Sequence, residues 1–106
     1  MRDLTASELR DHLAAANEPP LLLDVREEWE YGICRLEGSL LLPMGRLPAG
    51  IAHLEPARET VVICHHGIRS RMVAAFLERS GFTRVINLAG GVAAWARDVD
   101  PDMPVY

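Results

Sequence analysis

The chain has 106 residues, 49% of them hydrophobic, and a formal net charge of −4. This length predicts one domain, residues 1–106, that can bury a hydrophobic core, and the composition excludes a disordered chain. The acidic balance argues against nucleic acid or an acidic membrane surface as a partner, because binding to either requires a basic face.

The first half of the chain alternates helical patterns with short apolar runs. Thr5 and Glu8 have the spacing of a capping box, which predicts a helix over residues 5–17 that the prolines at 19 and 20 end. The apolar run over residues 21–25 is typical of a buried strand. The next predicted elements are a short helix over 26–33, a strand over 38–43 and a helix over 47–54.

The second half carries the strongest strand signal. Residues 61–64 are β-branched and apolar and end in Cys64, which predicts a buried strand. A loop over 65–69 follows, and then a helix from Ser70 to about Ser80, with Gly81 at its end. A strand over 85–88 and a short helix after Gly90 complete the predicted elements, before a tail that either packs on the domain or reaches a neighbouring chain. This alternation predicts an α/β fold around a parallel sheet.

Three features bear on the compartment. The first five residues do not combine a basic stretch with an apolar run, so we expect no signal peptide. No segment approaches the ~20 apolar residues of a membrane helix, so we expect no membrane partner. Cys34 and Cys64 do not form a disulfide framework. We therefore expect a cytoplasmic protein whose thiols stay reduced.

Cys64 begins the segment that carries chemistry, Cys64-His65-His66-Gly67-Ile68-Arg69-Ser70. It ends a predicted parallel strand, and ligands bind at the carboxyl ends of such strands. Gly67 permits a tight turn in which N–H groups converge, and the following helix adds its positive end. These surroundings favour a nucleophilic thiolate or a persulfide, and argue against the alternative of an inert buried cysteine.

Arg69 and the two histidines are expected to add hydrogen-bond donors for an anionic ligand. A metal site on Cys64, His65 and His66 is not expected, because three adjacent residues on one tight loop rarely converge on one ion. Hydrogen bonding from the histidines to a bound oxyanion is the preferred interpretation.

The segment 64–70 resembles the active-site loop of single-domain rhodaneses. Three further motifs resemble that family in the same order: Leu23-Asp24-Val25-Arg26, then Glu37-Gly38-Ser39 with Pro43, then Asn87-Leu88-Ala89-Gly90-Gly91 with Trp95. The resemblance implies a five-stranded parallel sheet with helices on both faces. It also implies a sulfurtransferase in which Cys64 takes a sulfane sulfur from a small-molecule donor, such as thiosulfate or a low-molecular-weight persulfide. The covalent Cys64 persulfide, formed without a cofactor, then passes its sulfur to a thiol, cyanide or a protein acceptor.

The same resemblance assigns supporting roles at the end of the predicted strand 21–25. Asp24 would help to hold the active-site loop, and Arg26 would pair with nearby acids; a weak surface ion pair is the alternative for Arg26. The family often has His where this chain has Cys34, and Cys34 is expected to be a packed side chain rather than a redox partner of Cys64.

Two other functions compete with sulfur transfer. A cysteine phosphatase or arsenate reductase has its arginine six residues after the cysteine, whereas the sixth residue here is Ser70 and Arg69 is the fifth. This shorter spacing favours a single sulfur atom over a tetrahedral oxyanion. A non-catalytic rhodanese-like binding module is the second alternative, and the presence of Cys64 in a complete loop argues against it.

Overall fold

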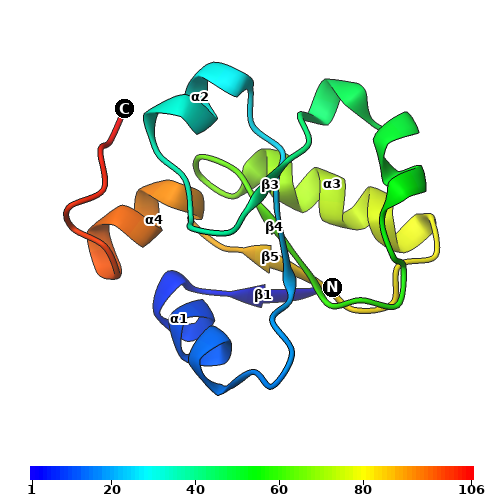
Figure 1. Ribbon diagram of the computed structural model, residues 1–106, viewed down its shortest axis with the longest axis horizontal. Helices are drawn as coiled ribbons and strands as arrows, with labels where there is room; N and C mark the ends of the chain where they lie inside the picture. Colours follow the sequence, from blue (N-terminus) through cyan, green and yellow to red (C-terminus); the bar gives the residue numbers. More distant parts are fainter.

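The computed structural model describes residues 1–106 and arranges them in three layers (Figure 1). Five parallel strands form one sheet in the order β1-β5-β4-β2-β3. Helices α1 (Ala6–Ala15) and α4 (Gly91–Asp98) pack on one face, and α3 (Ile68–Arg79) packs on the other. The predicted α/β architecture, with a five-stranded parallel sheet and helices on both faces, is confirmed.

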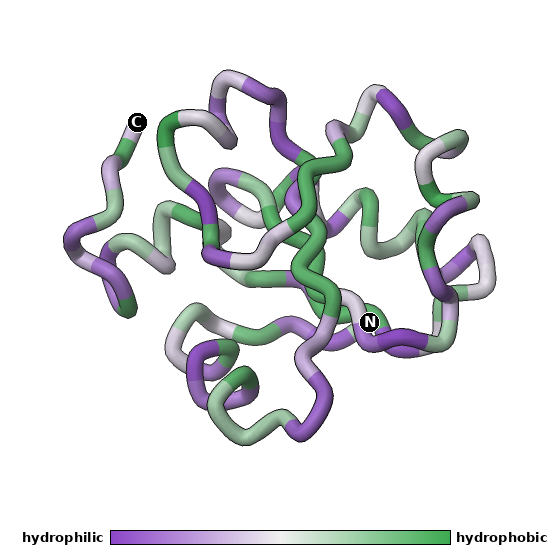
Figure 2. The backbone as a smooth tube through the Cα atoms, viewed as in Figure 1, coloured by the Kyte–Doolittle hydropathy of each residue, from purple (hydrophilic) through white to green (hydrophobic).

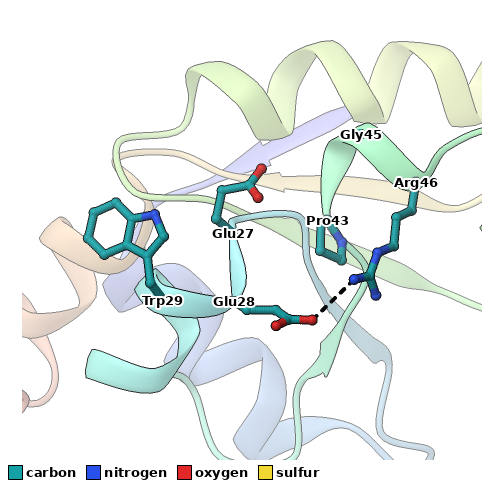
Figure 3. Close-up of a pocket in the computed structure, with 6 residues that line it drawn as sticks. All are labelled: Glu27, Glu28, Trp29, Pro43, Gly45 and Arg46. Carbon is teal, nitrogen blue, oxygen red and sulfur yellow. Dashed lines mark hydrogen bonds and ion pairs between the residues drawn. The ribbon is translucent and has the colours of Figure 1, made fainter.

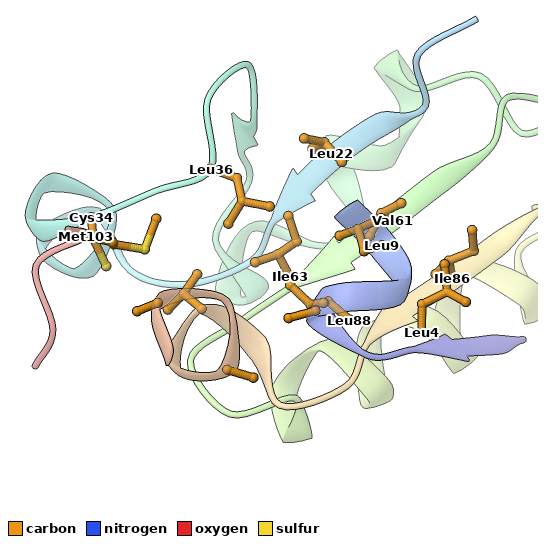
Figure 4. Packing of buried hydrophobic residues seen from close by; sticks show 14 residues of the cluster. Leu4, Leu9, Leu22, Cys34, Leu36, Val61, Ile63, Ile86, Leu88 and Met103 are labelled. Atoms are coloured by element: carbon orange, nitrogen blue, oxygen red, sulfur yellow. The ribbon is translucent and has the colours of Figure 1, made fainter. Parts of the chain in front are cut away.

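The strands β2, β4 and β5 form the centre of the sheet, and their residues are almost all buried. Successive side chains of a strand point to opposite faces, so β4 sends Val61 and Ile63 toward α1 and α4, and Val62 toward α3. Figure 4 shows the cluster on the first of these faces. Because both faces are covered, the central strands consist mostly of apolar residues (Figure 2). The strands are β1 (Arg2–Leu4), β2 (Leu21–Asp24), β3 (Leu40–Leu41), β4 (Thr60–Ile63) and β5 (Val85–Leu88).

The capping box at the start of α1 is confirmed. The N–H of Glu8 donates to the Thr5 hydroxyl at 3.1 Å, and the N–H of Thr5 donates to the Glu8 carboxylate at 2.9 Å. These bonds satisfy two N–H groups that have no partner within the helix. The helix ends at Ala15, two residues before the predicted end.

Several predicted boundaries are wrong in the connecting segments. The predicted helix over 47–54 is a 3₁₀ helix, Ala49–His53, because Pro48 and Gly50 interrupt the segment. The predicted strand over 38–43 pairs only over Leu40–Leu41, since β3 lies at the sheet edge and has β2 as its one neighbour. A second 3₁₀ helix covers Met44–Arg46, and α2 spans Glu28–Ile33, so Arg26 lies outside it.

Strand β1 was not predicted, because only Leu4 of its three residues is buried. It pairs in parallel with β5, a partner more than eighty residues away, so its formation depends on the assembled sheet. None of the helices has the length and apolar character needed to span a membrane.

Candidate active site

Cys64 follows β4 directly, and its loop meets the loop that follows the neighbouring strand β5. The carbonyl of Cys64 accepts a hydrogen bond from the N–H of Val92 at 2.9 Å, and the carbonyl of His65 accepts one from Ala93 at 3.1 Å. The first turn of α4 therefore binds the first two residues of the cysteine loop. This is the carboxyl edge of a parallel sheet, where the sequence placed the site.

Two glycines make this close approach possible. Gly67 has φ +97° and forms the N-cap of α3, which begins at Ile68, two residues before the predicted start. Gly91 has φ +59°, and a Cβ there would overlap the carbonyl oxygens of Cys64 and His65. Residues with a side chain rarely adopt a positive φ, so both positions require glycine. The tight turn predicted at Gly67 is confirmed.

The Cys64 sulfur lies at the base of the loop and is only 1% exposed. The N–H of Gly67 donates to Sγ at 3.1 Å, and Sγ lies 3.3 Å from the Ser70 hydroxyl, to which the thiol donates. The N–H groups of Ile68, Arg69 and Ser70 open α3 and have no acceptor within the helix. The helix start therefore presents donors and partial positive charge next to sulfur.

The Ser70 hydroxyl connects the cysteine to β5. It donates to Asn87 Oδ1 at 2.5 Å, and both side chains are at most 1% exposed. Asn87 Nδ2 in turn donates to Asp3 Oδ1 at 3.0 Å. The sequence placed Ser70 in the loop, but the role of Asn87 was missed because its side chain reaches the site only across the sheet.

Arg69 ties the loop to α2 through an ion pair with Glu30. Its two terminal nitrogens donate to the two oxygens of that carboxylate at 2.7 and 2.8 Å. The hydrogen bonds from Arg69 lower the pKa of Glu30 to about 2, with burial opposing the decrease. The same pairing raises the pKa of Arg69, which therefore keeps its charge. Arg69 was expected to offer donors to a ligand, and in the structure its terminal nitrogens already contact Glu30.

Arg26 is a buried charge, so the alternative of a surface ion pair is wrong. Its side chain is 0% exposed and donates to Asp24 at 2.7, 2.9 and 3.1 Å, and to the carbonyl of Cys34 at 2.6 Å. Burial lowers the pKa of Arg26, but the hydrogen bonds to Asp24 and Tyr106 and the Asp24 charge outweigh it, and the net change is an increase. The Asp24 side chain contacts Arg26 rather than the cysteine loop. Cys34 is buried in the core, as expected.

The tail packs on the domain, and Tyr106 joins the two ion pairs. Its hydroxyl accepts from Arg26 Nη1 at 2.8 Å and donates to Glu30 Oε2 at 2.8 Å. Its ring stacks on His65 with centroids 4.0 Å apart and planes at 14°. Burial raises the pKa of Tyr106 to about 12, so the hydroxyl keeps its proton. This role of Tyr106 could not be predicted from the sequence, because a tyrosine in an irregular tail has no local pattern.

The two loop histidines lie at the surface side of the cysteine loop. The His65 and His66 rings stack with centroids 4.0 Å apart. Burial lowers the pKa of His65, and the neighbouring His66 lowers it further, which favours the neutral ring. No group of three His, Cys, Asp or Glu side chains in residues 1–106 lies close enough to hold a metal ion.

A separate hollow of about 660 Å³ lies beside α2 (Figure 3). Glu28 and Arg46 form an ion pair of 3.1 Å across it, and the Trp29 side chain flanks it. None of the residues 64–70 lines this hollow, so it is distinct from the cysteine loop. Its lining residues are Glu27, Glu28, Trp29, Pro43, Gly45 and Arg46.

Comparison with known proteins gives consistent matches. The model of the rhodanese-like domain family matches residues 5–98. A sulfurtransferase from Allochromatium vinosum is 36% identical over 91 residues, 86% of this chain and 85% of that protein. The probable adenylyltransferase/sulfurtransferase MoeZ of Mycobacterium tuberculosis is 35% identical over 97% of this chain, which spans only 26% of MoeZ. The crystal structure of a rhodanese-like domain protein from Staphylococcus aureus matches with a TM-score of 0.82 and 28% identity, over 90% of this chain and 91% of that one.

The fold, the order of the sequence motifs and the extent of these matches all point to the same family. The match to the family model covers all strands except β1 and includes the complete cysteine loop. The chain therefore belongs to the rhodanese-like family.

Proposed function

We propose that this protein is a sulfurtransferase that carries a sulfur atom as a persulfide on Cys64. The observation that supports this most is the surroundings of Sγ, which accepts the Gly67 N–H at 3.1 Å and lies beside the start of α3. Donors converging on one sulfur atom stabilise the charge that develops on it or on a sulfur attached to it.

The transfer has two steps. The Cys64 thiolate attacks the outer sulfur of thiosulfate, so that an Sγ–S bond forms, the S–S bond of thiosulfate breaks, and sulfite leaves with the electron pair. An acceptor such as cyanide then attacks the outer sulfur of the persulfide. Thiocyanate leaves, and Cys64 returns to the thiolate.

The loop has two roles in this cycle. The free N–H groups at the start of α3 would bind the anionic outer sulfur, as an oxyanion hole binds oxygen. Arg69 would add positive charge while its ion pair with Glu30 fixes the loop. Because Cys64 is almost fully buried, we expect the side chains around the loop to move when the donor enters. His65 and His66 would contact the donor.

The partners follow from this chemistry. We propose thiosulfate or a low-molecular-weight persulfide as donor, and a thiol, cyanide or a sulfur-accepting protein as acceptor, without a cofactor and in the cytoplasm. The relative MoeZ is named as both adenylyltransferase and sulfurtransferase, and this chain matches about a quarter of it. Such a relative is compatible with a protein acceptor.

The test is the intact mass of the protein after exposure to thiosulfate, compared with the variant Cys64→Ser. We expect the wild-type chain to gain one sulfur atom and the variant to gain none. Adding cyanide should remove the sulfur from the wild type and release thiocyanate. Serine replaces one atom of a buried side chain, so the variant should keep its circular dichroism spectrum and its unfolding transition.

The outcomes separate the candidate functions. No added sulfur from thiosulfate or from glutathione persulfide would contradict the proposal and favour a binding module. Turnover of an aryl phosphate would favour a phosphatase, which the position of Arg69 argues against. A sulfur retained by Cys64→Ser would place the carrier on another residue.

A further inference from the structure

A chain of hydrogen bonds runs from the cysteine, which follows the central strand β4, to the edge strand β1. Cys64 Sγ lies 3.3 Å from Ser70 Oγ, Ser70 Oγ lies 2.5 Å from Asn87 Oδ1, and Asn87 Nδ2 lies 3.0 Å from Asp3 Oδ1. Cys64, Ser70 and Asn87 are each at most 1% exposed, whereas Asp3 is half-exposed on β1. The buried cysteine is thus connected to a surface carboxylate through two neutral side chains.

The chemistry of Asp3 fixes the direction of every bond in this chain. A carboxylate only accepts hydrogen bonds, so Asn87 must turn its amide nitrogen toward Asp3. The Asn87 oxygen must then face Ser70, where it accepts the hydroxyl hydrogen. The Ser70 oxygen is left with lone pairs directed at Cys64, and it can only accept from the thiol.

We propose that Asn87 is a positioning residue that orients the Ser70 hydroxyl as an acceptor for the Cys64 thiol, so that Ser70 does not stabilise the thiolate. A thiolate has no hydrogen to donate, and the Ser70 hydrogen is engaged with Asn87. To stabilise the thiolate, Ser70 must break its bond with Asn87 and turn. The Gly67 N–H donates to sulfur and favours the thiolate, but it is present in every variant compared below and so does not affect the differences between them.

The Asp3 end of the chain is itself held in its charged form. The hydrogen bond from Asn87 lowers the pKa of Asp3, burial opposes this, and Arg71 lowers it further through an ion pair of 2.5 Å. The carboxylate therefore remains an acceptor throughout the neutral range, and the direction of the bonds does not change with pH there.

Other charged groups surround the cysteine but do not enter this chain of bonds. Arg69 interacts electrostatically with Cys64 and would favour the thiolate, as would the start of α3. These groups are unchanged in the variants below, so they contribute equally to each measurement. The charged and titratable groups around the site are His65 and His66 on the loop, Arg69 and Arg71 on α3, Glu30 on α2, Asp24 and Arg26 at the end of β2, Tyr106 in the tail and Asp3 on β1.

The meaning of this device rests on the proposed function. In a persulfide carrier, a hydroxyl that accepts from the cysteine thiol opposes loss of its proton, and Ser70 must turn before it can stabilise the nucleophilic thiolate. The orientation itself can be tested by alkylation, which needs no sulfur donor. Failure of the proposed function and failure of this inference are therefore distinguishable.

The experiment measures the rate of Cys64 alkylation by iodoacetamide as a function of pH, with the adduct located by peptide mass. Asn87→Ala removes the acceptor of the Ser70 hydrogen and frees it for the thiolate. The pH midpoint of alkylation should fall by about one unit, the effect of one hydrogen bond to the charged form. Asp3→Asn allows the Asn87 amide to turn over, so the midpoint should also fall, by a smaller amount.

Two comparisons separate orientation from structure and from charge. In a Ser70→Ala background, Asn87→Ala should no longer shift the midpoint, because the hydroxyl through which it acts is absent. Arg71→Gln removes the ion pair of Asp3 and leaves its acceptor role, so the midpoint should stay within a few tenths of a unit. A purely electrostatic effect would shift the alkylation midpoints of Asp3→Asn and Arg71→Gln in opposite directions. Both shifts would then become smaller in high salt.

An unchanged or raised midpoint in Asn87→Ala would overturn the proposal, and so would a shift that persists in the Ser70→Ala background. If Asn87→Ala does not fold, Asp3→Asn decides the matter. Asp3 lies at the surface, so the circular dichroism spectrum of the Asp3→Asn variant should match that of the wild type. A midpoint for Asp3→Asn equal to that of the wild type would then reject the inference.

Discussion

At the scale of single residues, the side chains beside the cysteine loop form one connected set of charges. Arg26 is the centre of this set: it is buried, it pairs with Asp24, and it reaches Tyr106. A buried cation is tolerated only when its hydrogen bonds are satisfied, and every buried side-chain nitrogen and oxygen in the chain has a partner. The Tyr106 hydroxyl is the link that extends this set to Glu30 and so to Arg69 on the loop.

Tyr106→Phe tests that link. The ring remains to stack on His65, but Arg26 and Glu30 each lose one hydrogen bond. We expect the free energy of unfolding to fall by about 1.5–3 kcal/mol, as for hydrogen bonds to charged groups, and sulfur transfer from thiosulfate to slow. Denaturant unfolding and thiocyanate formation are the measurements.

Tyr31→Phe is the matched control. The Tyr31 hydroxyl donates to the Ser39 carbonyl at 2.6 Å and is not bonded to the loop residues. This variant should lose some stability and keep the transfer rate of the wild type. If both variants slow transfer equally, Tyr106 acts only through stability.

At the scale of elements, the site depends on the contact between two loops rather than on any one helix or strand. N–H groups in the first turn of α4 donate to the Cys64 and His65 carbonyls. Gly91 allows this turn and the cysteine loop to approach each other, because it has no side chain. The positive φ of Gly67 directs its N–H toward sulfur in the same way. Local backbone conformation therefore decides where the donors of the site point.

Gly91→Ala should displace the cysteine loop, because the new Cβ would overlap two backbone oxygens that cannot turn away. We expect at least a tenfold loss of sulfur transfer together with a lower melting temperature. Gly32→Ala in α2 is the control: a Cβ there meets nothing within 4 Å, and alanine favours a helix. Gly32→Ala should therefore keep full activity, and normal activity in Gly91→Ala would contradict this account of the loop contact.

At the scale of the whole molecule, the ion pair of Arg69 and Glu30 links the two sides of the candidate site. Arg69 comes from the first turn of α3, which follows β4, and Glu30 comes from α2, which follows β2. β2 and β4 are neighbours in the sheet, so the strand order brings the two charges together. Because Glu30 titrates, this ion pair makes the stability of the fold depend on pH.

This dependence has a definite sign. The pKa of Glu30 is about 2 in the folded protein, below its ordinary 4.5. A carboxyl group whose pKa is lower in the folded than in the unfolded protein stabilises the fold at pH values above its unfolded pKa. This stabilisation is lost as the pH falls from about 4.5 to about 2. The loss should be about 3 kcal/mol.

Denaturant unfolding between pH 7 and pH 2, compared with Glu30→Gln, measures this contribution. The amide cannot titrate, so the variant should be less stable at pH 7 and should lose less stability toward pH 2. Parallel acid profiles for the two proteins would show that Glu30 does not contribute in this range.

The features predicted correctly from the sequence are those that depend on residues close together in the chain. The capping box of Thr5 and Glu8, the buried strands and the tight turn at Gly67 follow from side-chain type and spacing within a few positions. The alternation of short apolar runs with helical patterns also predicted the parallel sheet, and the position of Cys64 at the end of a predicted strand placed it at the carboxyl edge of that sheet. One local pattern gave a wrong prediction: the residues 47–54 have helical spacing, but proline and glycine limit the segment to a short 3₁₀ helix.

Only the tertiary structure decided which distant side chains complete the site. Asn87 contacts Ser70 from the neighbouring strand, and Tyr106 in the tail contacts Glu30. Glu30 forms an ion pair with Arg69, which was expected from the sequence to bind a ligand. The burial of Arg26 also could not be read from its neighbours, because it depends on Asp24, Tyr106 and the Cys34 carbonyl closing around it. The sequence by itself determined the α/β class and the cysteine loop, since those depend on local spacing. The partners of the loop were decided by the packing of separate strands, whose positions no local pattern specifies.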